Sequence, residues 1–312
     1  MQKILEYVIQ RTAKNNVAWL FYRKCGQLSN SLRRIYKHAQ SVRLPRSTQP
    51  GLLAWQPADD RRILQIAAQL SPDLTVATGP FKQMRYPSAD SVGSELLPKL
   101  LGSYESELHP VLEEMLGHGY DTIVDVGCAE GYYAVGLALR LPRAQVYAFD
   151  TDSAAKQLCA QMARLNGVAD RIHIKDFCDE EVLRSIPLGD RALIVSDCEG
   201  YEGSLFNRQV AEFLVKHDVI IETHDFIDIE LSGKMRDAFA GTHHIRSIKS
   251  LDAIEKTHTF HDRALEPYSA RDKYLILKEE RESIMEWLVM TSKQVRAPAE
   301  PASTPSSAIS AT

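Results

Sequence analysis

The stretch Thr122–Gly136, TIVDVGCAEGYYAVG, decides the fold prediction for this chain of 312 residues. Its apolar run Ile123–Val126 predicts a buried strand that ends at Gly127. Gly131 then opens a predicted helix over 132–140. Glycine lacks a Cβ, so the backbone can turn sharply there and approach a ligand closely. A strand, a glycine turn and a helix in this order are typical of the first unit of a nucleotide-binding α/β domain.

The same alternation continues along the chain. Further strands are predicted at 145–149, 171–174, 192–196 and 219–222, each followed by helical residues. Strands joined through helices need crossover connections, which predict a parallel sheet covered on both faces. Residues 244–248 and 274–278 are strand-like with no strong helix between them, so we expect an antiparallel pair at the sheet edge. The predicted fold is therefore α/β and Rossmann-like: a seven-stranded, mostly parallel sheet with helices on both faces, an antiparallel last strand and a helical N-terminal extension.

Charge and composition divide the chain into four expected regions. Residues 1–46 carry ten Lys and Arg against one acid, whereas the whole chain has a net charge of −4. Such a basic arm can contact an anionic glycan, a membrane surface, nucleic acid or an acidic partner, or can simply be a solvated helix. We expect a basic helical extension over 1–50, a helical and extended lead-in over 51–118, the sheet domain over 119–291 and a disordered tail over 292–312.

The cysteines and the N-terminus point to a cytoplasmic protein. The five cysteines show no CxxC spacing, which argues against a zinc site or a disulfide framework and fits a reducing compartment. The longest apolar patch near the start, Val17–Tyr22, is too short for a signal peptide or a transmembrane segment.

Acidic residues at the predicted strand ends favour an adenosyl ligand. Asp150 ends the second strand and can accept hydrogen bonds from both ribose hydroxyls, while Asp176 follows the third strand and can accept from an adenine amino group. Phe177 offers the base a flat apolar face. Glu130 lies beside the predicted helix N-terminus, where an acid disfavours a phosphate, and Ala129 replaces a glycine of the dinucleotide fingerprint. S-adenosylmethionine, which has no phosphate and carries a positive sulfonium, suits this acidic pocket.

The segments DVGCAEGYYA, AFDTD, KDF and SDCEGYE resemble class I S-adenosylmethionine-dependent methyltransferases, specifically the FkbM-type group. The resemblance covers about 101–278 and includes that group's D-x-E-G-x-E motif, here Asp197 to Glu202. It implies that the methionine and ribose side of the cofactor contacts Asp125, Gly127, Ala129 and Gly131. It further implies that the ribose contacts Asp150, that the adenine contacts Asp176 and Phe177, and that Tyr104 and Glu105 are weaker candidates for closing over the cofactor.

Methyl transfer to a hydroxyl needs a group that removes the hydroxyl proton. Asp197, Glu199, Glu222 and His224 follow two strands expected to be neighbours, so their side chains can converge. In one hypothesis His224 is the base, oriented by a carboxylate, with Asp197 and Glu199 as further catalytic candidates. In the other, Asp197 and Glu222, with His224 as a further candidate, bind Mg²⁺, as acids at these strand ends do in sugar and catechol O-methyltransferases.

The leading hypothesis is an O-methyltransferase acting on a sugar or polyol-bearing metabolite, which is a small molecule or a glycan with a free hydroxyl. Nucleic acid is not the expected acceptor, because no aromatic-interleaved basic motif accompanies the charged arm. A nicotinamide- or FAD-dependent oxidoreductase and a non-catalytic cofactor-binding scaffold remain alternatives. The N-terminal helices also offer a surface for a homo-oligomer.

Overall fold

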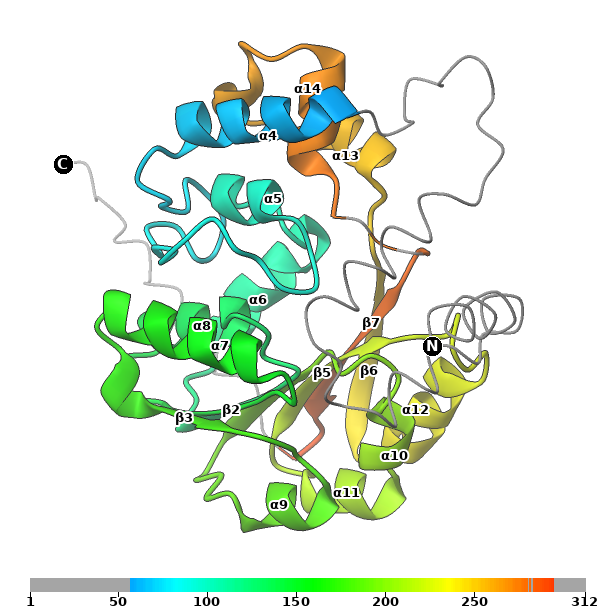
Figure 1. Ribbon diagram of the computed structural model, residues 1–312. Coiled ribbons are helices and arrows are strands. Elements are labelled where there is room, and N and C mark those ends of the chain that lie inside the picture. The colour runs from blue at the N-terminus through cyan, green and yellow to red at the C-terminus, as the bar shows by residue number, and fades with distance from the viewer. Residues whose placement is uncertain (1–56, 280, 282, 295–312) are drawn as a thin grey trace, which may run out of the picture. The chain divides into compact units, whose positions relative to one another are not determined.

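The computed structural model describes residues 57–279, 281 and 283–294 (Figure 1). The expected basic helical extension over 1–50, and with it the predicted oligomer surface, lies outside the described residues. So does the expected tail beyond residue 294. Within the part that is described, no helix has both the length and the apolar character needed to cross a membrane.

The described residues build one seven-stranded sheet in the order β3-β2-β1-β4-β5-β7-β6. Strands β1 to β5 pair in parallel, whereas β7 pairs antiparallel with both β5 and β6. This confirms the predicted mostly parallel sheet with an antiparallel last strand. The strands are β1 (Thr122–Val126), β2 (Gln145–Phe149), β3 (Ile172–Lys175), β4 (Ala192–Ser196), β5 (Asp218–Thr223), β6 (His243–Lys249) and β7 (Glu286–Ser292).

The predicted strand over 274–278 was wrong. These residues belong mainly to helix α14 (Ala270–Leu277), which begins with a capping box between Ser269 and Asp272. Reciprocal side-chain to backbone hydrogen bonds of this kind satisfy free N–H groups in the first turn and favour a helix over a strand. The antiparallel partner of β6 is instead β7, whose continuous apolar run is buried on both faces. Helix α13 (Ala253–Thr259) also lies between β6 and β7, where no strong helix was predicted.

Helices cover both faces of the sheet because successive strand residues point to opposite sides. Ile123 joins one apolar cluster and its neighbour Val124 joins the other. The first cluster includes residues of α6 (His109–Leu116), α7 (Tyr132–Arg140) and α8 (Ser153–Leu165). The second includes residues of α9 (Glu180–Ser185), α10 (Glu202–Leu205), α11 (Arg208–Phe213) and α12 (Leu231–Phe239).

A third apolar cluster holds a group of helices that we call the helical cap. The helical cap consists of α4 (Pro57–Leu70), α5 (Leu96–Leu101), α13, η3 (Arg263–Leu265) and α14, which lie together at the top of Figure 1. Its centre is buried, and Arg62 donates two hydrogen bonds of 2.8 Å to Asp272 across it. The chain returns from the cap into β7, whose first residue pairs with Thr223 at the carboxyl end of β5. The cap therefore joins the sheet next to the strand ends that carry the predicted site.

Candidate functional site

The glycine turn after β1 is fixed by backbone hydrogen bonds and by a close approach to the segment after β4. The N–H groups of Gly127 and Cys128 both donate to the carbonyl oxygen of Phe149, at 2.9 Å each. Gly127 has a φ of +90°, and a Cβ at this position would lie 1.7 Å from the carbonyl oxygen of Asp197. Only glycine avoids both the strained backbone and this collision.

Asp150 is held against the turn by two backbone donors. The N–H of Ala129 donates to its Oδ2 at 2.9 Å and the N–H of Asp152 to its Oδ1 at 2.7 Å. Burial raises the pKa of Asp150, and these two donors partly offset that effect. Each carboxylate oxygen can accept more than one hydrogen bond, so both remain available to a ribose.

Asp125 offers an unpartnered buried oxygen below the same turn. Its side chain is only 3% exposed, and its Oδ2 has no hydrogen-bond partner among the described residues. Burial raises the pKa of Asp125 to about 8. A buried oxygen without a donor is costly, and a ligand that brings a cationic N–H group would satisfy it.

The side chain of Glu130 is buried and paired inside the protein. It is 1% exposed, pairs with Lys99 at 2.6 Å and accepts a 3.0 Å hydrogen bond from the N–H of Val92. Because Lys99 balances its charge, Glu130 disfavours a phosphate at this helix N-terminus less than an unpaired acid would.

The remaining predicted cofactor residues lie farther out or are engaged in other contacts. The Asp176 side chain is 88% exposed and pairs with Lys156, while Phe177 lies 5.0 Å from Tyr201 between ring centroids. Tyr104 contacts Tyr132 edge to face. Glu105 is buried, accepts a hydrogen bond from the hydroxyl of Tyr133 and pairs with Arg281. These contacts define where the four side chains lie but leave their cofactor roles as predictions.

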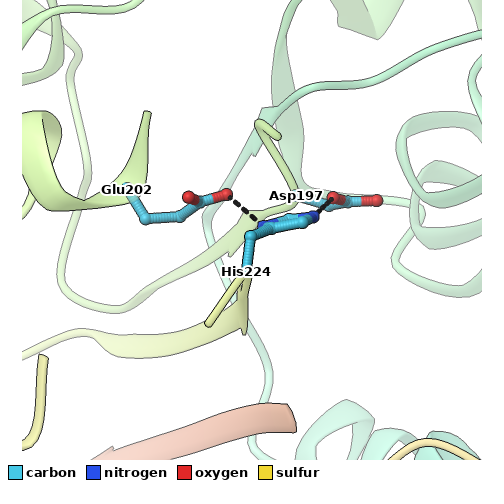
Figure 2. Close-up of side chains that lie close together, drawn as sticks. All are labelled: Asp197, Glu202 and His224. Atoms are coloured by element: carbon cyan, nitrogen blue, oxygen red, sulfur yellow. Dashed lines mark ion pairs between the residues drawn. The ribbon is translucent and has the colours of Figure 1, made fainter. Parts of the chain in front are cut away.

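The predicted catalytic residues come together around one nitrogen of His224. Its Nε2 lies 3.4 Å from Asp197 Oδ1, 3.7 Å from Glu199 Oε2 and 3.8 Å from Glu222 Oε2. The other nitrogen, Nδ1, lies 3.1 Å from Glu202 Oε1, and Figure 2 shows the imidazole between Glu202 on one side and Asp197 on the other. We call these five residues the acid–histidine cluster.

Glu202 is the member of this cluster that the predicted site did not include. It is fully buried, and its Oε1 accepts a 3.0 Å hydrogen bond from the N–H of Cys198. Glu199 and Gly200 both have positive φ, which folds the chain back so that Glu202 approaches His224. The signal was present in the sequence, because Glu202 is the last residue of the D-x-E-G-x-E motif.

The acid–histidine cluster is electrostatically unbalanced. Burial lowers the pKa of His224, but Glu202, Asp197 and Glu222 outweigh it and raise the pKa to about 10. Burial, together with the nearby Asp197, raises the pKa of Glu222. A histidine in these surroundings keeps its proton at neutral pH unless another cation takes the place of that proton. The carboxylates of the cluster therefore stabilise a positive charge at His224, carried either by its proton or by another cation.

Arg281 connects this cluster to the helical cap, and no sequence pattern predicts this role. Its guanidinium pairs with Glu222, with Glu105 at 3.0 Å and with Glu279 at 2.9 Å. From α13, Lys256 pairs with the same Glu279. Arg281 lies 59 positions from Glu222 in a run of charged residues, so no local spacing marks it.

Comparisons with known proteins give structural likeness only. No protein-family model matches the chain, and no curated protein matches it. Solved structures with a similar fold include TrmN from Thermus thermophilus, 16% identical with a TM-score of 0.38 over 60% of this chain and 49% of its own. A precorrin-6y C5,15-methyltransferase from Geobacter metallireducens is 9% identical with a TM-score of 0.40, over 59% of this chain and 88% of its own. Geranyl diphosphate methyltransferase in complex with S-adenosylmethionine is 13% identical with a TM-score of 0.36. The likeness covers 63% of this chain and 89% of that methyltransferase. At these identities and scores the likenesses carry no argument about this chain, so the site itself must support the functional conclusion.

Proposed function

We propose that this chain is an S-adenosylmethionine-dependent methyltransferase that acts on a hydroxyl of a sugar or other polyol-bearing acceptor. The observation that carries the proposal is the direct contact between two regions of different chemistry. The glycine turn packs against the backbone of Asp197, where a Cβ on Gly127 would collide with the carbonyl oxygen. A ligand held by the turn would thus lie beside the acid–histidine cluster.

The residues around the turn suit a cationic adenosyl ligand. The unpartnered oxygen of Asp125 suits an ammonium group, and Asp150 is held in place to accept from ribose hydroxyls. We assign the methionine and ribose side to Asp125, Gly127, Ala129 and Gly131. Asp150 would hold the ribose, and Asp176 and Phe177 would contact the adenine. Tyr104 and Glu105 are further candidates for closing over the cofactor.

The acid–histidine cluster would receive the acceptor. When bound, S-adenosylmethionine supplies a methyl group on a positive sulfur, and in-line transfer to the acceptor oxygen leaves a neutral thioether and one proton. Asp197 and Glu199 are partly exposed carboxylates next to His224 and can take up that proton. A divalent cation on Asp197 and Glu222 would instead lower the pKa of the acceptor hydroxyl. Full activity in excess EDTA would exclude the metal-assisted version, and loss of activity restored by added metal would support it.

Two other functions remain as outcomes of the test. A nicotinamide- or FAD-dependent oxidoreductase would use the same turn to bind a dinucleotide. A cofactor-binding scaffold would bind S-adenosylmethionine without transferring its methyl group.

The test is isothermal titration calorimetry of the full chain with S-adenosylmethionine and with NAD, followed by radiolabelled methyl transfer. We expect binding of S-adenosylmethionine but not of NAD, weakened about tenfold by Asp150→Asn, because one charge-assisted hydrogen bond contributes about 1.5 kcal/mol. Asp170→Asn, at an exposed position in the short 3-10 helix η2 (Ala169–Arg171), is the matched control. The acceptor panel holds neutral sugars, polyols and tRNA. Preferential NAD binding would refute the proposal, methylation of tRNA alone would refute the sugar acceptor, and binding without transfer would favour the scaffold.

A further inference from the structure

We infer that Nε2 of His224, together with Asp197 and Glu222, binds a divalent ion of the zinc class, such as Zn²⁺, Co²⁺ or Fe²⁺, rather than Mg²⁺. We further infer that Glu202 positions the histidine for this ion. The inference deepens the proposed function, on which the catalytic use of the ion rests, but binding of the ion can be measured without cofactor or acceptor.

The spacing of the candidate ligand atoms is close to that of a coordination shell. With bonds of 2.0 to 2.2 Å, two ligands of a tetrahedral ion lie about 3.4 Å apart. The observed separations from His224 Nε2 are 3.4 Å to Asp197 Oδ1 and 3.8 Å to Glu222 Oε2. Among the described residues, the group whose potential ligand atoms all lie within 4.8 Å of one another is Asp197, Glu202 and His224. Glu222 is not in that group, so its side chain must rotate toward Asp197 to complete the proposed set of three ligands.

Exposure decides which nitrogen of His224 faces the ion. On the Nδ1 side, Glu202 has a fully buried side chain, so no route from solvent reaches that contact. On the Nε2 side, the side chains of Asp197 and Glu199 are 29% and 65% exposed. An ion enters from this open side, and Glu199 lies at the entrance to attract it.

Glu202 fits the position of an orienting carboxylate. Histidines that bind metals usually donate their other ring N–H to a carboxylate or carbonyl, which fixes the tautomer and the ring orientation. Here that second nitrogen faces Glu202, whose Oε1 is itself held by the N–H of Cys198. In the described residues Nδ1 has no hydrogen-bond partner despite its 3.1 Å approach to Glu202 Oε1, so a small rotation of the ring is needed to form the orienting bond.

The charges also match a divalent ion. Arg281 pairs with Glu222 through Oε1 and leaves Oε2 turned toward His224. Asp197 Oδ1 is buried and has no hydrogen-bond partner in the described residues. Two carboxylate oxygens and one neutral imidazole then carry a charge of −2. Mg²⁺ prefers oxygen ligands, whereas an imidazole nitrogen suits Zn²⁺, Fe²⁺ and their neighbours.

The experiment measures the ion on the full chain after metal is removed with EDTA and the chelator is dialysed away. Calorimetry with Zn²⁺, Co²⁺ and Mg²⁺ should show one site that prefers Zn²⁺ and Co²⁺ at least tenfold over Mg²⁺. The Co²⁺ protein should show a hyperfine-shifted imidazole N–H signal in its proton NMR spectrum, which exchanges slowly because Glu202 covers that proton. No such signal, or tighter binding of Mg²⁺, would overturn the inference.

Variants separate this site from adventitious binding. His224→Gln and Glu222→Gln should remove tight binding, and Glu202→Gln should weaken it by about 10- to 100-fold. His244→Gln and Glu212→Gln change exposed residues on other elements and should leave binding unchanged. Equal binding by His224→Gln and the unchanged chain would refute the site. If His224→Gln does not fold, as circular dichroism would show, the NMR signal of the unchanged protein decides. Titration with S-adenosylmethionine tests the proposed function separately.

Discussion

The glycine turn and the acid–histidine cluster lie side by side but are specified in opposite ways. The turn is made of consecutive residues, 127–131, and its shape depends on backbone hydrogen bonds and on positions where a Cβ does not fit. The cluster gathers side chains from 197–202, 222–224 and, through its ion pairs, residue 281. Its shape depends on charge balance. We therefore expect the turn to be sensitive to backbone changes and the cluster to be sensitive to changes of charge.

We expect the largest effect from Gly127→Ala, which should disturb both the turn and the acid–histidine cluster. The new Cβ would overlap the carbonyl oxygen of Asp197, so the turn and the cluster must separate. We expect a loss of about 4 kcal/mol in the free energy of unfolding, measured with urea, together with loss of S-adenosylmethionine binding. Gly233→Ala is the control, because a Cβ there meets nothing within 4 Å and alanine favours a helix. Equal stability of the two variants would contradict the described contact.

We expect the second-largest effect from Arg281→Met, which changes the charge balance of the cluster and leaves the turn unchanged. Arg281→Met leaves the buried carboxylates of Glu105 and Glu222 without their cation, which we expect to cost about 3 kcal/mol in unfolding free energy at pH 7. Arg246→Met removes an exposed pair with Glu114, so it should cost less than about 1 kcal/mol. The difference between the two variants should shrink at pH 4, where the carboxylates can take up protons. A constant difference across this range would argue against a charge effect.

A pH measurement tests Asp125, which lies at the end of β1 just before the turn. Burial raises the pKa of Asp125 to about 8, well above that of an aspartate in the unfolded chain. Its favourable contribution to stability is therefore complete below about pH 4 and is lost as the pH rises toward 8. We expect Asp125→Asn to flatten this part of the curve of melting temperature against pH. An unchanged slope would show that Asp125 is not the group responsible.

We expect the smallest effect from relieving backbone strain at one residue of the turn and at one residue of the cluster. Ala129 in the turn and Glu199 in the cluster have φ of +47° and +54°, where glycine is favoured. Ala129→Gly and Glu199→Gly should each raise stability by up to about 1 kcal/mol in thermal melts. Glu199→Gly should also weaken metal binding, because it removes a carboxylate beside His224, whereas Ala129→Gly should leave metal binding unchanged. Equal loss of metal binding in both variants would contradict the separation of the two regions.

The turn and most strands of the sheet could be predicted because each is specified by residues that are close together in the sequence. The run from Thr122 to Gly136 contains a strand, a turn and a helix, and the structure has all three there. The predicted strand over 274–278 was wrong because the apolar run 274–277 belongs to α14, whose start is fixed by the capping box between Ser269 and Asp272. The convergence of Asp197 and His224 followed from the expected neighbouring strands. The pairing of Arg281 with Glu222 could not be predicted, because the whole helical cap must fold before the two side chains meet.

The helical cap also has a consequence for the order of folding. Arg62 and Asp272 are 210 positions apart, and the apolar cluster around them likewise joins the beginning and the end of the described chain. Contacts over such a distance form slowly, because a long loop must close before they contribute any stability. During synthesis they cannot form until α14 has left the ribosome. The guanidinium of Arg281, which follows α14, therefore reaches its carboxylates at the end of folding, so partly made chains hold an incomplete site.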